Sequence, residues 1–449
     1  MVKTREIDMT KGSIFKKILV CTIPIAIMSV LQTLFNATDI AIVGIYRGDD
    51  AVAAVGANTS LISLITGLFI GLSMGANVVL AKYKGKENLE GAKRVVGTSI
   101  CVSIIAGVFL VIVGVLLAEK FLIIMGCPDD ILKQATTYLT IYLTGMPVVM
   151  LYNFLASLLR AVGDTLRPMI FLIISGAMNV ALNVLFVLGF GMNVEGVAYA
   201  TLISQAFSAI CCLVVVLKGK GYCRFNLRNF RIYKKELVEI IKIGVPSGIQ
   251  GCLFSLSNVF LQSAVNGLGT ETVAANAAST LFDAIVYFIG NSFAVACMSF
   301  VGQNYGAGDI KRVKKVIKVS VLMVIIGSFA FGGLIALFSK QLLGIVTETP
   351  EVNAIAQIRL KLLGLTYFMC GVMEVLSYSL RALGRSVGSM IICLIGACVF
   401  RIIWINTIFL LNKTYFMVYL CYPITWMLTI SALVIYIIKT IKNIENIMP

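Results

Sequence analysis

Apolar runs of 18 or more residues recur from one end of this chain to the other. A run of that length can cross the hydrocarbon core of a bilayer as a single helix. Only 13% of the residues are charged, against about 25% in soluble domains, which is too few to cover a water-facing surface. The sequence therefore predicts an all-α polytopic membrane protein with twelve transmembrane helices, near residues 15–41, 52–81, 95–118, 134–157, 168–190, 194–217, 238–265, 274–301, 316–338, 353–378, 387–411 and 416–438.

The basic residues are distributed unevenly between the loops, and the chain carries a net charge of +16. With the N-terminus placed inside, 29 of the 37 Lys and Arg residues fall in inner segments, and 7, including Arg359 near the outer end of the span at 353–378, are counted with the outer loops. The positive-inside rule then predicts that both termini are cytoplasmic. Because the basic charge follows the topology, we expect no nucleic-acid partner.

The sequence contains an internal repeat. Short motifs recur at an offset of 221 residues, as when Arg-Ala-Val-Gly at 160–163 returns as Arg-Ala-Leu-Gly at 381–384. Each half holds six spans, an even number, so both halves enter the membrane from the same side as parallel repeats. The predicted domains are an N-terminal six-helix bundle (1–217), a basic cytoplasmic linker (218–242) and a C-terminal six-helix bundle (243–449).

An acidic residue, Asp39, lies inside the first apolar run. It shares one helical face with Gln32 and Asn36, because these residues are spaced four and three apart. A carboxylate near the bilayer centre costs roughly 2.5–3.5 kcal/mol, so it must face protein, water or an ion. One interpretation is that Asp39 touches water near the outer mouth, and the other is that it has a functional role.

Further oxygen donors lie on the fifth and sixth spans. Asn179 and Asn183 are four residues apart and share a face, and Thr201 follows on the next span. Together with Asp39 they form an oxygen set that suits a proton or a hard cation such as Na⁺. Alternatively, the asparagines serve only as interhelical hydrogen bonds.

The C-terminal half carries its own ionisable residues. Asp283, Glu374 and Arg401 lie in the eighth, tenth and eleventh spans, and Asn153 stands at the position equivalent to Glu374. A buried arginine needs an anionic partner, so we expect Arg401 to pair with Glu374 or Asp283. These residues form either a substrate cavity with Gln32, Asn36 and Asn153, or a buried ion pair that only fixes helix packing.

Several signatures of catalysis are absent from the sequence. It contains no histidine, no His-Glu-x-x-His, no Gly-x-Ser-x-Gly and no Walker A motif, so a membrane enzyme and an ATP-driven pump are both disfavoured. Any proton coupling must then run through carboxylates. Pro24 and Pro246, at matching points of spans one and seven, predict kinks that could act as hinges.

In four motifs the chain resembles the multidrug and toxic compound extrusion (MATE) transporters of bacterial type. The motifs are FNATD at 35–39, LRAVGD at 159–164, FVGQNYGAGD at 300–309 and MEVL at 373–376. The resemblance implies two bundles around a central V-shaped cavity. It also implies antiport of organic cations, drugs or metabolites, against Na⁺ or H⁺ across the cell membrane, with an ion site at Asp39, Asn179, Asn183 and Thr201.

Many relatives carry Asp where this chain has Asn183, so Na⁺ and H⁺ both stay open as the coupling ion. The two halves predict rocking-bundle alternating access by a monomer in membrane lipid, with no cofactor other than the ion. An alternative is a flippase for lipid-linked saccharides on a related duplicated scaffold. Such flippases tend to hold phosphates with several arginines, whereas here a single intramembrane Arg401 accompanies three acids.

Overall fold

The computed structural model describes residues 6–347 and 349–447, apart from the side chains of Ser60 and Leu227. Over these residues the chain is helical, with short connections and without a β-strand. The first half contains α1 (Ile14–Arg47), α2 (Asp49–Gly85), α3 (Leu89–Ile124), α4 (Asp129–Thr144), α5 (Met146–Ala161), α6 (Leu166–Val184), the π-helix η1 (Leu185–Gly189), α7 (Val194–Lys218) and the 3₁₀-helix η2 (Leu227–Asn229). The second half contains α8 (Lys234–Asn266), α9 (Thr270–Gly306), α10 (Ile310–Leu337), α11 (Ser339–Gly344), α12 (Pro350–Ala382), α13 (Ser386–Cys393), the π-helix η3 (Leu394–Val399), α14 (Phe400–Asn406), α15 (Ile408–Leu411) and α16 (Tyr415–Ile447).

The predicted all-α membrane fold is confirmed. Eleven helical segments of the described chain are long and apolar enough to cross a membrane, and a bent pair supplies a twelfth. The bent pair corrects the prediction of one continuous span at 134–157, because α4 and α5 meet at an angle of 50°. Gly145 ends α4, and Pro147 stands in the first turn of α5, where its missing N–H cannot continue the preceding helix.

The chain divides into two compact units. One comprises the segment ending at Asp8 together with Ile27–Gly244, and the other comprises Met9–Ala26 together with the chain from Val245 onward. Both α1 and α8 therefore begin in one unit and end in the other. Residues 218–242, expected to form a linker, belong to the first unit, and α8 already begins within them.

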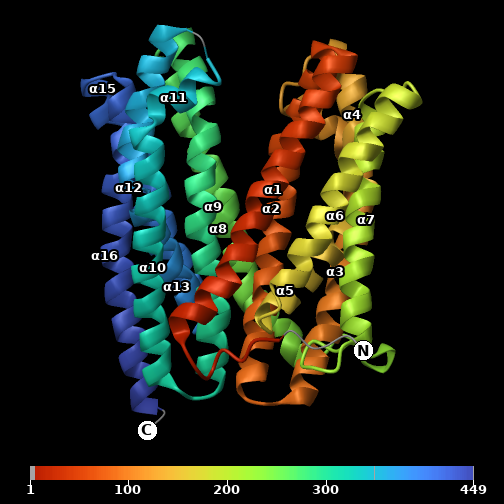
Figure 1. Cartoon of the computed structure of the whole chain (residues 1–449), viewed down its shortest axis with the longest axis vertical. Coiled ribbons are helices and arrows are strands. Elements are labelled where there is room, and N and C mark those ends of the chain that lie inside the picture. The colour runs from red at the N-terminus through yellow and green to blue at the C-terminus, as the bar shows by residue number, and fades with distance from the viewer. Residues whose placement is uncertain (1–5, 348, 448–449) are drawn as a thin grey trace. The chain divides into compact units, whose positions relative to one another are not determined.

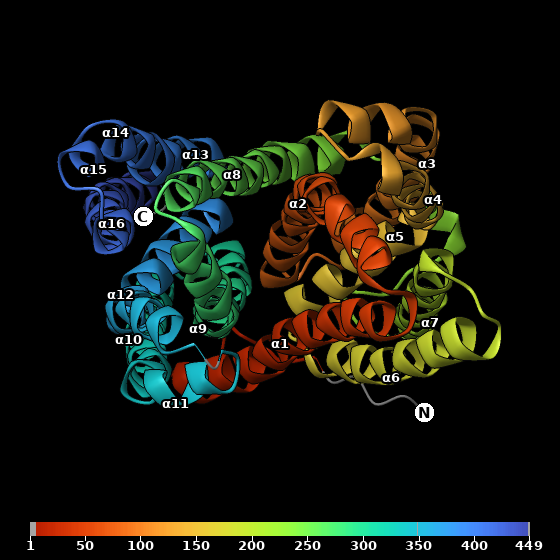
Figure 2. The same ribbon diagram turned by 90° about the horizontal axis from the view of Figure 1, so that it is seen from above.

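In the first unit, α5 packs against α2, α3 and α7 (Figure 2). Hydrogen bonds between polar side chains and backbone carbonyls also join α2 to α5. Asn77 Nδ2 donates to the Ser157 carbonyl at 2.8 Å, and Ser157 Oγ donates to the Ser73 carbonyl at 2.8 Å, so α2 and α5 are bonded in both directions. Such bonds fix helix register in a bilayer, where the hydrophobic effect between helices is weak.

In the second unit, α9, α10 and α12 pack side by side, with α16 against α12 (Figure 1). Glycines set the spacing of the three helices. A Cβ at Gly364 on α12 would lie 2.6 Å from the Gly332 carbonyl oxygen on α10, and one at Gly290 on α9 would lie 3.3 Å from Gly371 Cα on α12. We call Gly290, Gly332, Gly364 and Gly371 the glycine seam. It brings three backbones into direct contact.

The motif at 300–309 ends α9 and begins α10. Gln303 accepts a hydrogen bond from the Met9 N–H at 3.2 Å, and Asn304 Nδ2 donates to the Met9 carbonyl at 3.2 Å. Gly308 adopts a positive φ of 77°, and Asp309 caps α10 by accepting from the Arg312 N–H at 2.8 Å. The polar residues of this motif thus hold a fully buried Met9 and turn the chain between two helices.

Candidate functional site

The first candidate site is built on α1, α6 and α7. Asp39 on α1 accepts from Asn183 Nδ2 at 2.5 Å through Oδ1 and from Thr201 Oγ1 at 3.2 Å through Oδ2. Asn179 Nδ2 donates to Thr201 Oγ1 at 3.3 Å, and its Oδ1 accepts from Asn183 Nδ2 at 3.3 Å. The structure therefore brings together all four residues that the sequence predicts as an ion site.

Local packing explains why these side chains meet. Phe35 lies one turn before Asp39, and its ring occupies the space that a side chain at Gly176 would fill. Asn179 and Asn183 follow Gly176 on the same face of α6, so the turn of α1 that carries Asp39 lies over them. Arg47, at the end of α1, donates to the Val187 carbonyl in the π-helix η1 and holds the two segments together.

The Asp39 cluster has an unsatisfied acceptor. Asp39 is 7% exposed and Asn183 is fully buried, yet Asn183 Oδ1 has no hydrogen-bond partner in the part of the chain that the structure describes. Buried polar atoms are normally hydrogen-bonded, so a lone acceptor beside a carboxylate suits a donor or cation. Among the described residues no three of His, Cys, Asp and Glu gather as a metal site, and the donors here are mainly amide and hydroxyl oxygens.

Three other polar residues of the first unit lie outside the Asp39 cluster. Gln32 and Asn36 are exposed on α1, and Asn153 on α5 donates to the Val149 carbonyl at 2.9 Å within its own helix. Their contact with a substrate stays a prediction.

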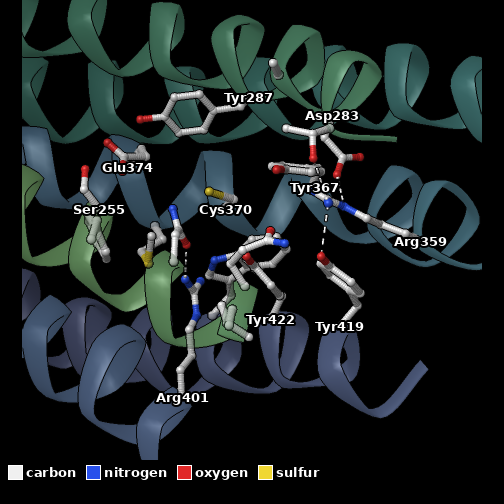
Figure 3. A pocket seen from close by; sticks show the side chains of 18 of the residues that line it. Ser255, Asp283, Tyr287, Arg359, Tyr367, Cys370, Glu374, Arg401, Tyr419 and Tyr422 are labelled. Carbon is white, nitrogen blue, oxygen red and sulfur yellow. Dashed lines mark hydrogen bonds and ion pairs between the residues drawn. The ribbon is translucent and has the colours of Figure 1, made fainter. Parts of the chain in front are cut away.

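The second candidate site is a pocket of about 470 Å³ within the second unit (Figure 3). Asp283, Glu374 and Arg401 all line it, as the sequence predicts of a shared cluster. Its walls also carry the aromatic residues Phe254, Tyr287, Tyr367, Tyr419, Tyr422 and Trp426. A volume of this size is in the range of pockets that hold organic molecules.

The predicted pairing of Arg401 with an acid is wrong. Asp283 pairs instead with Arg359, whose Nε lies 2.5 Å from the carboxylate. Arg359 also donates to Thr280 Oγ1 at 2.9 Å, to the Tyr419 hydroxyl at 3.1 Å and to Asn276 Oδ1, and it is 7% exposed. Its Nε and Nη1 donors are thus used within a buried network, which is the arrangement that a desolvated guanidinium requires.

The sequence does not predict this role for Arg359, because the residue is assigned there to the outer loops. Helix α12 begins at Pro350, so nine residues at about 1.5 Å each place Arg359 roughly 13 Å along the helix. The sequence alone does not show whether a charged residue near the end of an apolar segment lies inside or outside the membrane span. Only the position of the helix start, marked by Pro350, could have indicated that this arginine is buried.

Arg401 lies apart from both acids. Within the described chain it forms no ion pair; its Nη1 lies 3.5 Å from Asn258 Oδ1, and its guanidinium carbon is 4.1 Å from the centroid of the Tyr422 ring. Glu374 interacts with Tyr378 and Asn291 and with the charge of Arg381. Arg401 is the second residue after η3, and π-helical turns are frequent at functional sites.

The two predicted hinge prolines lie inside α1 and α8. The division between the two units falls at Ala26/Ile27 in α1 and at Gly244/Val245 in α8, within three residues of Pro24 and of Pro246. Each proline removes a backbone hydrogen bond where its helix passes from one unit to the other. Motion at these points stays a prediction.

Comparison with known proteins identifies the fold and the family. A solved structure described as the outward-facing conformation of a multidrug resistance MATE family transporter superposes with a TM-score of 0.92 at 23% identity, covering 99% of this chain and 100% of that one. Two Bacillus subtilis proteins are similar in sequence. The probable multidrug resistance protein YoeA is 30% identical over 386 residues (84% of this chain, 82% of YoeA), and the probable multidrug resistance protein YpnP is 27% identical over 394 residues (88% of each).

The MatE family model matches the chain twice, at residues 24–185 and 246–408. The two matches cover most of both halves and agree with the internal repeat. The chain therefore belongs to the MatE family, whose members are transporters and not enzymes.

Proposed function

We propose that this protein is a secondary active antiporter that exports organic cations, drugs or metabolites, in exchange for H⁺ or Na⁺. The observation that carries the proposal is that Asp39 is buried without a basic partner within residues 6–347 and 349–447. Among the described residues no Lys or Arg forms an ion pair with this buried carboxylate, whereas Asp283 has Arg359. A buried carboxylate without a basic partner is stabilised by binding a proton or a metal cation, which is what coupling requires.

The names of the similar proteins support the export of drugs. YoeA and YpnP are both called probable multidrug resistance proteins. The pocket of the second unit supports it too, because aromatic rings attract organic cations and Glu374 supplies a carboxylate.

We further propose that the two parallel halves work by rocking, with Pro24 and Pro246 as the hinges. The duplicated sequence supports this mechanism. The bias of Lys and Arg toward the loops assigned as inner supports cytoplasmic termini in the cell membrane. A monomer with one ion site is sufficient for the cycle.

A flippase for lipid-linked saccharides is supported less well. The pocket of the second unit contains two arginines, but Asp283 neutralises Arg359, so a single guanidinium is left for a phosphate.

Ethidium efflux from proteoliposomes tests the export proposal. Either an imposed Na⁺ gradient or an imposed H⁺ gradient should drive ethidium uphill, and collapsing that gradient with the matching ionophore should stop it. If neither gradient moves ethidium in vesicles that contain folded protein, the antiport proposal is overturned.

A further inference from the structure

We infer that the pocket of the second unit binds aromatic ligands that carry a carboxylate as well as a positive charge, with the carboxylate on Arg401. The inference rests on the proposed export function and names one ligand class within it, aromatic zwitterions, beside simple organic cations.

Arg401 is a buried cation with unused hydrogen-bonding capacity. Its side chain is 5% exposed, and its Nε has no hydrogen-bond partner among the described residues. Figure 3 shows the side chain extending from α14 toward the pocket. The contacts to Asn258 and to the Tyr422 ring orient the guanidinium but do not neutralise it. A planar guanidinium in this state matches a carboxylate, which can accept two parallel hydrogen bonds.

Neither of the two acids that line the pocket pairs with Arg401. Asp283 is bound by Arg359 at 2.5 Å. Glu374 lies across the pocket from Arg401 in Figure 3, on α12, where it interacts with Tyr378, Asn291 and the charge of Arg381. An anion that enters the pocket therefore meets one guanidinium that no protein carboxylate has taken.

The charges of the pocket also favour a ligand with both signs. The lining contains two acids, Asp283 and Glu374, and two arginines, Arg359 and Arg401. A ligand that carries both a positive and a negative group can engage Glu374 and Arg401 at the same time. Glu374 can face the positive end of the same ligand whose carboxylate lies on Arg401.

The body of the ligand should be aromatic. Tyr422 stacks on Tyr419 at 5.7 Å and lies 5.4 Å from Trp426, which in turn lies 5.3 Å from Tyr367. This wall of rings offers flat apolar surface beside Arg401, against which an aromatic ligand can stack.

A matched pair of dyes tests the inference. Rhodamine 110 carries a free carboxylate beside its cationic xanthene, and rhodamine 123 is its methyl ester. Fluorescence polarisation gives both Kd values on one preparation of the full chain in dodecyl maltoside, without any ion gradient. We expect wild type to bind rhodamine 110 about tenfold more tightly, the difference that one charge-assisted contact supplies. Equal affinities in wild type would overturn the inference.

Substitutions then locate the contact. Arg401→Gln should bring the ratio of the two Kd values to about one, while Arg385→Gln, which removes an exposed arginine of the same unit, should keep the wild-type ratio. A preference that survives Arg401→Gln overturns the assignment. If Arg401→Gln does not fold, Arg401→Lys decides, because it keeps the charge but loses the planar fork: a reduced or abolished preference supports the inference, and an unchanged preference overturns it.

The anion could also be a lipid phosphate, and the same assay separates the two sources. Phosphatidylglycerol added to the micelles should leave the preference for rhodamine 110 in place. Suppression of that preference assigns Arg401 to lipid headgroups and overturns the small-molecule assignment. Because no gradient is used, failure here leaves ethidium export untouched, and absence of ethidium export leaves the dye ratio untouched.

Discussion

Arg359 Nε on α12 lies 2.5 Å from the Asp283 carboxylate on α9, and this contact divides the charged residues that line the pocket into two classes. Asp283 and Arg359 neutralise each other inside a network that also holds Asn276, Thr280 and Tyr419. Glu374 and Arg401 are then the residues that a ligand can engage. The pair thus acts as part of the scaffold.

The Asp283–Arg359 pair should behave as a coupled unit in stability measurements. Arg359→Ala leaves Asp283 buried and uncompensated, which costs about 3–5 kcal/mol. The joint change Asp283→Asn with Arg359→Gln removes both charges and should cost less than either single charge removal. Thermal melting of the purified variants measures the difference. Losses that simply add in the double variant would show that the two residues are not coupled.

Asp39→Asn should abolish coupled export while the protein still folds. The new amide keeps its size and can accept from Asn183, and the Thr201 hydroxyl can rotate to accept from the new amide. The change removes the group that binds the ion, so ethidium efflux driven by a gradient should fall by about tenfold or more. Asp50→Asn, which removes an exposed acid of the same unit, is the control and should retain export. Uphill export at wild-type rates by Asp39→Asn would exclude Asp39 as the coupling residue.

Asn183→Asp should make the protein respond to sodium. It places a second carboxylate against Asp39, at a contact now 2.5 Å long, and two adjacent carboxylates in a dry site favour a bound cation. At a Na⁺ concentration ten times the Kd, binding raises the free energy of unfolding by about 1.4 kcal/mol. The melting temperature should therefore be higher in sodium chloride than in choline chloride. Asn153→Asp, in the same unit but outside the Asp39 cluster, should show no such difference; an equal sodium response in both variants would contradict the prediction.

A side chain introduced into the glycine seam where α10 and α12 are closest should destabilise the protein. A Cβ at Gly332 would collide with the Gly364 carbonyl oxygen, whereas one at the neighbouring Gly333 meets nothing within 4 Å. We expect Gly332→Ala to lower the free energy of unfolding by about 1–3 kcal/mol, the range for overpacking. Gly333→Ala should be neutral or stabilising by up to about 1 kcal/mol, since alanine favours helix. Similar melting temperatures for the two variants would show that the seam can open without cost.

Much of this architecture could be predicted from the sequence. The apolar period and the repeat offset place the spans, apart from the break in the fourth, because a bilayer accepts only helices or closed barrels and a duplicated chain repeats its span lengths. Asp39, Asn179, Asn183 and Thr201 could be grouped because two of them are four residues apart and all four lie in apolar segments where polar groups must find each other.

The ion-pair partners, the π-helix η3 and the break in the fourth span cannot be predicted from the hydrophobic periodicity alone. Which acid an arginine reaches is decided by helix rotation and by the depth of each residue. The sequence therefore predicts an acidic partner for Arg401 and none for Arg359, whereas the structure pairs Arg359 with Asp283. The π-helix η3 shifts the register just before Arg401, and its sequence, Leu394–Val399, contains no signal that distinguishes it from α-helix. The bend at Gly145 can be predicted in part from the sequence, because Pro147 follows it.

The single carboxylate in the Asp39 cluster sets an energetic ceiling on the proposed exchange. One negative charge accommodates one monovalent ion per cycle, so the driving force cannot be increased by loading several ions at once. If a neutral zwitterion leaves while that ion enters, each cycle moves one net charge across the membrane. A membrane potential of about 100 mV then contributes about 2.3 kcal/mol, and it can sustain a substrate concentration ratio near 50-fold before any ion gradient is added. A simple cation exchanged for the same ion would leave the voltage without effect. The dependence of steady-state accumulation on voltage therefore reports the net charge of the cargo.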